Sequence, residues 1–141
     1  MLSTLSETET LELLQLQNIN SNTALHCAAD RGHTETVECI VNSVSTPDLV
    51  RQLRMQNKDG KTPLHYAADS DYGETLKAMT DKLTVADLLD ILSIQDKDGD
   101  TIAHLLTRGG YTETLDSMCR RLSPVQYHQL LNIQNAAGST L

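Results

Sequence analysis

The chain has 141 residues, the length of one ordinary domain, and 39% of them are hydrophobic although Phe and Trp are absent. The formal net charge is −8, from 11 basic and 19 acidic residues, which argues against nucleic acid or an anionic membrane surface as the ligand. Three cysteines without a C-x-x-C pair argue against a disulfide framework or zinc knuckle. We expect small buried or half-buried thiols in a reducing compartment, and therefore a cytoplasmic protein, with the nucleus as the alternative.

A Thr-x-x-His motif recurs at a fixed spacing along the chain. It begins at Thr23, Thr62 and Thr101, at a period of 39 residues, and Thr140 follows at the same step. A strict period indicates an array of units rather than one globular core. The array divides into a partial unit 1–15, repeats 16–54, 55–93 and 94–132, and a truncated unit 133–141. Neither end has the polar cap of a natural array, so we expect this single array, 1–141, to be a fragment of a larger protein.

Each unit is expected to open with a tight hairpin loop. Gly60, Gly99 and Gly138 stand at the same position in successive repeats, which we call a column. They supply the backbone freedom that a tight turn requires. Ser21 stands in this column in the first repeat, so we expect a looser or differently shaped turn there. The Thr of the motif then predicts the N-cap of a first helix, and Pro63 fits its first residue.

A second helix is expected after the left-handed position that ends the first one. Gly32 and Gly110 hold that position, with Asp71 between them. The apolar residues that follow recur at the i, i+3, i+4, i+7 spacing of one buried helix face. They are Val37, Ile40, Val41 and Val44 in one repeat and Leu76, Met79 and Leu83 in the next.

A third element shares the spacing of a capping box, a hydroxyl residue followed three positions later by an acid or amide. The pairs are Ser6 with Glu9, Ser45 with Asp48, Thr84 with Asp87, and Ser123 with Gln126. They predict a short third helix of about eight residues in every unit. Leu89 is expected to be one of its packed side chains.

The segment T-P-L-H-Y-A-A after N-K-D-G-K resembles the ankyrin repeat, and T-A-L-H-C-A-A-D-R-G-H in the first repeat resembles it well. The third repeat departs most, with Ile102 for Pro, Ala103 for Leu, and Leu106-Thr107 for the Ala pair. The resemblance covers essentially the whole chain. It implies an all-α ankyrin-repeat solenoid of helix–turn–helix units with hairpin loops. The period of this chain is longer than the family's repeat, and we expect the additional residues to form the short third helix.

The resemblance also implies a concave recognition face, built from hairpin tips and first helices, that binds another protein. A wide shallow face suits a folded domain or an extended peptide, whereas small ligands need a pocket. Tyr66 and Tyr72 are expected to be aromatic anchors, although Tyr66 alternatively packs between repeats. The candidate partner-binding residues are Asp30, Arg31, Lys58, Asp59, Lys61, Tyr66, Asp69, Ser70, Tyr72, Lys97, Asp98, Asp100 and Arg108.

We expect no catalytic, cofactor-binding or metal-binding residues. His26, His65 and His104 share one column, and neighbouring helices lie ~8–10 Å apart, too far for their rings to reach one zinc ion at ~2.0–2.3 Å. The resemblance implies a structural role for these rings, through hydrogen bonds to nearby backbone. The stretch from Asp96 resembles a calcium loop superficially, but Thr107 stands where the closing Glu is needed.

Two functions remain open at this point. The first is a non-catalytic, monomeric protein–protein interaction module, with no nucleic acid or membrane insertion. The second is a structural spacer or scaffold whose repeats contact mainly adjacent domains of the parent protein. Loss of a captured partner on charge reversal along the hairpin tips distinguishes the first from the second.

Overall fold

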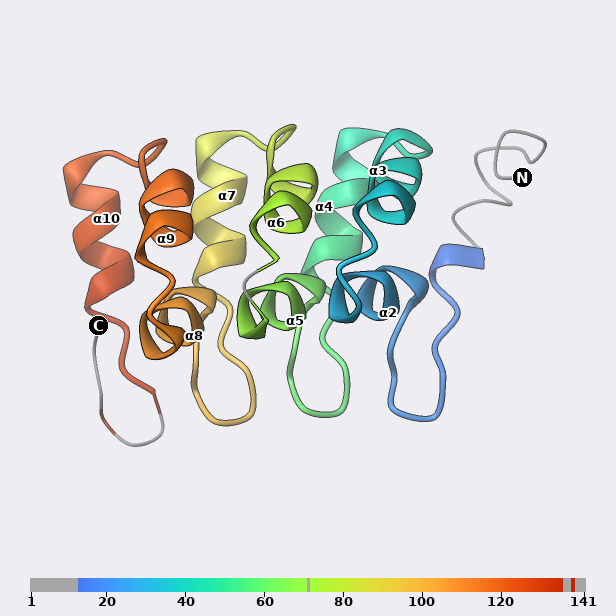
Figure 1. Ribbon diagram of the computed structural model, residues 1–141, viewed down its shortest axis with the longest axis horizontal. Coiled ribbons are helices and arrows are strands. Elements are labelled where there is room, and N and C mark those ends of the chain that lie inside the picture. The colour runs from blue at the N-terminus through green and yellow to red at the C-terminus, as the bar shows by residue number, and fades with distance from the viewer. Residues whose placement is uncertain (1–12, 71, 136–137, 139–141) are drawn as a thin grey trace.

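The computed structural model describes residues 13–70, 72–135 and 138. Asp71 and the pattern beginning at Ser6 therefore lie outside the described residues. Across these ranges the regular elements are all helices, as predicted, and they are labelled as in Figure 1. The first helices are α2 (Ala24–Asp30), α5 (Pro63–Asp69) and α8 (Ile102–Gly109). The second helices are α3 (Thr34–Asn42), α6 (Gly73–Thr80) and α9 (Thr112–Cys119), and the third are α4 (Thr46–Arg54), α7 (Val85–Leu92) and α10 (Pro124–Leu131).

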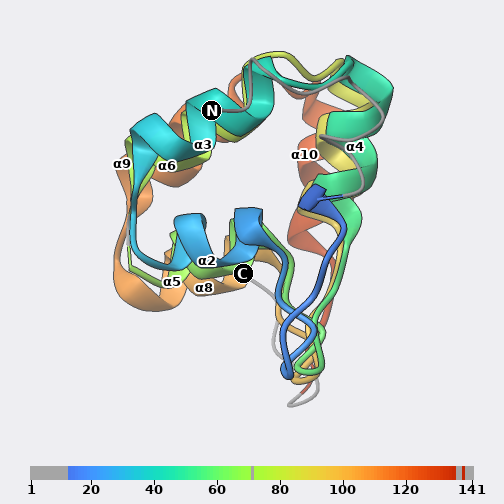
Figure 2. The ribbon, with the colours of Figure 1, turned by 90° about the vertical axis from the view of Figure 1, so that its right-hand side faces the viewer.

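The helices form three parallel rows, one for each position in the repeating unit (Figure 1). Seen end on, the rows of first, second and third helices lie at three corners, and the hairpin loops all project on one side (Figure 2). The core between the rows consists of Leu, Ile, Val, Met and Ala side chains and of Cys119. This stacking explains how the chain builds a core without Phe or Trp.

The first helices begin at the Thr-x-x-His motif as predicted. In all three, the Thr side chain accepts a hydrogen bond from the His backbone N–H, and the His ring accepts one from the Thr backbone N–H. Pro63 is the first residue of α5, where its missing N–H costs no helical hydrogen bond. Gly32 and Gly110 adopt left-handed backbone after α2 and α8, also as predicted.

The prediction of a looser turn at Ser21 is wrong. Ser21 has a φ of 64°, close to the 73° of Gly60 and the 77° of Gly99. Its N–H donates to the carbonyl of Asn18 at 2.9 Å, as the glycines do in their own turns. The side-chain oxygen of Asn18 accepts two further backbone N–H groups of the loop, and these bonds stabilise the turn despite the serine.

The predicted third helices are present, and their length matches the expected eight residues closely. Each of α4, α7 and α10 is capped by the hydroxyl of its Ser or Thr, but among these three only Ser123 and Gln126 form the full reciprocal box. Gln126 reaches back to the backbone N–H of Ser123 at 2.9 Å. The side chains of Asp48 and Asp87, one methylene shorter than Glu, make no such bond.

The third helices pack into the core through one face. Leu49 and Leu53 on α4 are fully buried, and Leu88 on α7 is 1% exposed. Leu89, which we expected to be a main packing residue, is only half-buried because it lies one position further round the helix. Leu88 therefore anchors α7 together with Ile91 and Leu92.

Gln52 on α4 interrupts this apolar face, since the same column holds Ile91 on α7 and Leu130 on α10. The Gln52 side chain is 0% exposed, and neither its amide nitrogen nor its oxygen has a hydrogen-bond partner among the residues that the structure describes. A buried polar group without a partner costs about 1–3 kcal/mol. We expect Gln52→Leu to raise the free energy of unfolding by roughly 1–2 kcal/mol in urea denaturation.

The matched control is Gln129→Leu on α10, where the glutamine is exposed. Its effect should stay within about 0.5 kcal/mol. Destabilisation by Gln52→Leu would show instead that the amide makes a stabilising contact.

The expectation of buried or half-buried thiols holds for only one cysteine. Cys119 is buried, and burial raises its pKa to about 11. Cys27 and Cys39 are exposed because both lie on helix faces turned away from the core. All three are free.

Candidate functional site

A column of glutamines joins the second, third and fourth hairpin loops. Gln56 donates from Nε2 to the carbonyl of Gly60 in its own loop at 2.8 Å and to that of Gln95 in the next loop at 3.0 Å. Gln95 repeats this arrangement and reaches the carbonyl of Gln134 at 2.7 Å. These glutamines are visible in the sequence at equal spacing, but they were not among the predicted functional residues.

Each loop is also held from within by an Asn or Asp at its start. Asn57 accepts the backbone N–H groups of Asp59 and Lys61 on Oδ1 at 2.9 and 3.0 Å. Its Nδ2 donates to the hydroxyl of Tyr66 at 2.6 Å and to Asn22 of the preceding loop at 2.7 Å. The loops are therefore rigid projections.

The tips of these loops carry exposed side chains. Lys58 and Asp59 form one tip, and Lys97 and Asp98 form the next, all exposed as the sequence predicted. Ile19 holds the position of the two lysines in the first loop and is 83% exposed. An isoleucine at a position that holds lysine in the next two repeats is visible in the sequence, but Ile19 was not among the predicted contact residues.

Four other predicted contact residues form two ion pairs at matching positions. Lys61 Nζ lies 3.5 Å from Asp69 Oδ2, and Arg108 Nη2 lies 3.0 Å from Asp100 Oδ1. Asp100 stands in the column of Lys61, and Arg108 stands in the column of Asp69. The acidic and basic residues have therefore exchanged positions between the two repeats. Asp100 is 3% exposed and also accepts a hydrogen bond from Asn135, so it positions Arg108 and is not the exposed contact residue that we expected.

The remaining charged and polar predictions lie where the first helices end, on the side away from the hairpins, where the chain turns towards the second helices (Figure 2). Asp30 is the last residue of α2 and Arg31 its C-cap, and Ser70 is the C-cap of α5. All three side chains are exposed. We name the loop tips and these helix ends together the tip face.

The two predicted aromatic anchors pack between repeats. The Tyr66 ring meets His26 edge-on, with ring centroids 6.1 Å apart, and Lys61 Nζ lies 5.4 Å from its centroid. Tyr72 is half-buried, and its ring packs against Gly32 of the preceding unit. For Tyr66 this is the alternative that the sequence left open.

The histidine column joins neighbouring units through backbone, as the resemblance implied. His65 Nδ1 accepts the N–H of Thr62 at 3.2 Å, and its Nε2 donates to the carbonyl of Asp100 in the next loop at 3.0 Å. His26 reaches the carbonyl of Lys61 in the same way at 2.9 Å. One neutral tautomer satisfies every partner, so these rings serve structure.

Burial lowers the pKa of His26 and of His65 below the ordinary value of 6.5. The unfolded chain therefore binds more protons than the folded chain below that pH. The stabilisation from the neutral rings is complete above about 6.5 and is lost as the pH falls towards the lowered values. We expect urea denaturation to show lower stability at pH 5 than at pH 7.5, with a smaller difference between the two in His65→Gln.

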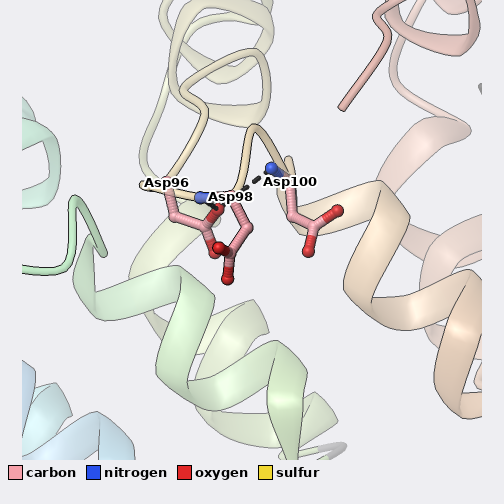
Figure 3. A group of neighbouring side chains, drawn as sticks. All are labelled: Asp96, Asp98 and Asp100. Atoms are coloured by element: carbon pink, nitrogen blue, oxygen red, sulfur yellow. Dashed lines mark hydrogen bonds between the residues drawn. The ribbon is translucent and has the colours of Figure 1, made fainter. Parts of the chain in front are cut away.

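Three carboxylates of the third loop, those of Asp96, Asp98 and Asp100, lie within 4.8 Å of one another (Figure 3). The Oδ1 atom of Asp96 accepts the backbone N–H groups of Asp98 and Asp100. Asp100 Oδ1 accepts from Arg108 and Asn135. These bonds are those of a tight turn, as the sequence indicated.

A groove of about 390 Å³ opens between α6 and α9, away from the tip face. Charged side chains of both signs line it, Glu74, Lys77 and Arg121 among them. None of the predicted contact residues contributes to it. No helix within the described ranges is long and apolar enough to cross a membrane.

A family model described as ankyrin repeats in three copies matches residues 2–89, which is more than half of the chain. A search of the curated proteins found no match. The helical units stacked in rows, with the Thr-x-x-His caps and the hairpin loops, agree with that family model. The chain therefore belongs to the ankyrin-repeat family, whose members are generally protein–protein interaction modules.

Proposed function

We propose that this chain is a non-catalytic recognition module that binds another protein on its tip face. The observation that carries the proposal is the rigid ladder of hairpins. It holds exposed charged tips, and one exposed isoleucine, at a regular spacing on one side of the array. A loop whose backbone is held in place in advance loses less conformational entropy on binding than a flexible loop does.

The contacts that we propose fall into two groups. Ile19, Lys58, Asp59, Lys97 and Asp98 contact the partner from the loop tips. Asp30, Arg31, Asp69, Ser70 and Arg108 contact it from the ends of the first helices. Lys61, Tyr66, Tyr72 and Asp100 hold this surface in place through their contacts within the array.

We further propose that residues 1–141 act as one array in the cytoplasm or nucleus. The three free cysteines support a reducing compartment. Eleven basic against nineteen acidic residues favour a protein partner over nucleic acid or an anionic membrane.

The experiment is affinity capture on the immobilised chain, followed by quantitative binding of the recovered protein. The double variant Lys58→Glu and Lys97→Glu reverses two exposed tip charges. Neither lysine side chain has an ion-pair partner among the described residues, so the fold is not expected to change. We expect affinity to fall at least about ten-fold.

The matched control is Arg51→Glu and Arg54→Glu, which makes the same change in net charge on α4 in the third row. It should alter affinity by less than about two-fold. Equal losses in both variants would show a nonspecific charge effect. Loss in the α4 variant alone would move the binding surface to the third helices.

A structural spacer is the second candidate. The two ion pairs, Lys61 with Asp69 and Arg108 with Asp100, favour it because they neutralise four charges of the tip face within the array. A spacer would recover no partner sensitive to the tip variant.

A further inference from the structure

The groove between α6 and α9 lies inside the array, where two units meet differently from the pair before them. The hydroxyls of Thr34 on α3 and Thr75 on α6 lie 2.8 Å apart and join those two helices. The same two columns hold Gly73 and Thr114 between α6 and α9, so one of the two side chains is absent there. The backbones of α3 and α6 approach each other closely, whereas those of α6 and α9 do so at few points. The groove therefore follows from the glycine that begins α6.

One end of the groove is acidic. Glu74 in the first turn of α6 and Glu113 in the first turn of α9 line this end, one from each helix. Both side chains are exposed, and neither has an ion-pair partner among the described residues. The helix dipoles favour both positions, but carboxylates on neighbouring helices also repel each other. A cationic group placed between them would relieve that repulsion.

The opposite end of the groove is lined by Arg121, which follows α9. Its guanidinium donates from Nη1 to the carbonyl of Thr80 at 2.9 Å and from Nη2 to the carbonyl of Leu83. These bonds fix the guanidinium at the end of α6, and its other N–H groups are left for an acceptor in the groove. Lys77 and Asp81 also line the groove, and their opposite charges offset each other.

The floor between the two ends is apolar. Leu88 on α7 and Met118 on α9 line it and are only 1% and 8% exposed. Glu113 and Arg121 are eight positions apart in the chain, which corresponds to roughly 12 Å along a helix. The volume of about 390 Å³ lies within the range of pockets that bury ligands. The groove thus presents acidic, apolar and basic groups in a line.

We propose that this groove binds a short extended peptide segment that carries a basic, an aliphatic and an acidic side chain at alternate positions. Alternate side chains of an extended chain lie on the same side of it, and four residue steps span roughly 13 Å. The basic side chain lies between Glu74 and Glu113. The aliphatic side chain covers the floor, and the carboxylate binds Arg121. This site is separate from the tip face and goes beyond the function proposed above.

Titration of the isotope-labelled chain with the blocked peptide acetyl-Arg-Ala-Leu-Ala-Glu-amide, followed by NMR, tests the proposal. We expect saturable changes in the amide shifts of α6 and α9. The peptide acetyl-Arg-Ala-Leu-Ala-Arg-amide should bind at least about five-fold more weakly, because its second arginine meets Arg121. Changes confined to other helices, or no saturable change with the first peptide, would overturn the proposal.

Gly73→Thr closes the groove without removing a charge. The variant gives α6 the residue that begins α3, and a Cβ at Gly73 would lie 3.4 Å from Thr114 Oγ1, which is an ordinary contact distance. The fold should therefore be retained, as an unchanged or higher melting temperature would show. Because the threonine occupies the acidic end, affinity for the first peptide should fall at least about ten-fold. Undiminished binding by this variant would contradict the site.

The acidic end is tested by the double variant Glu74→Gln and Glu113→Gln, which should weaken binding of the first peptide at least about five-fold. Glu35→Gln is the matched control, since Glu35 stands in the same column on α3 and does not line the groove. Its effect should be under about two-fold. Equal losses in the two variants would overturn the proposal. The tip variant Lys58→Glu and Lys97→Glu should bind the peptide normally, so this site and the proposed function are tested separately.

Discussion

Replacing His65 with alanine is expected to lower the free energy of unfolding by about 3 kcal/mol or more. The ring is fully buried and joins three groups, the N–H and hydroxyl of Thr62 and the carbonyl of Asp100 in the next loop. Its removal leaves the backbone groups without partners in the protein interior and opens a cavity between two units. Urea denaturation followed by circular dichroism measures the change.

His33→Ala is the matched control. His33 is exposed and makes no side-chain capping bond at the start of α3. Its effect on stability should stay within about 0.5 kcal/mol. A comparable loss in the two variants would show that the buried histidine column does not join the units as described.

Leu88→Ala should cost about 2–4 kcal/mol of stability, because it removes the most buried leucine side chain at the centre of α7. The effect tests whether the third helix is part of the folded core. If α7 were a loosely attached insertion, the same change would alter the urea midpoint little.

Val85→Ala on the same helix is the comparison, since Val85 is 37% exposed. Alanine also has the higher helix propensity, so this variant should lose less than about 1 kcal/mol. A cost below about half a kcal/mol for Leu88→Ala would contradict the packing of the third row.

The repeating framework was predictable because its signals are local. The Thr-x-x-His motif marks the start of every first helix, and Pro63 and the glycines fall where a helix begins or a turn closes. The third helices were predictable because their caps lie within four residues of one another.

Contacts between units were harder to predict because they join residues far apart in the chain. The burial of Asp100 follows from Arg108 and from Asn135, which lies 35 residues later. The turn at Ser21 depends on the side chain of Asn18, which a rule for single turn residues does not include. Ile19 was not predicted as a contact residue because contact residues at the loop tips were expected to be charged, and Ile19 is apolar.

The residues of the proposed tip face could be named from the sequence, but the sequence could not tell which of their charges are paired within the array. Lys58 and Lys97 are exposed and free of ion pairs with the described residues, whereas Lys61 and Arg108 are each paired. Sequence columns place all four on one side of the array. The three-dimensional structure is needed to tell the charges that are paired within the array from those that are not.

Amide hydrogen exchange of the chain with and without its captured partner tests the central claim most directly. Recognition through the tip face predicts slower exchange in residues 57–61 and 96–100 and at the ends of α2 and α5, with little change in α4, α7 and α10. Protection confined to the third helices or to the outer row of α3, α6 and α9 would contradict it.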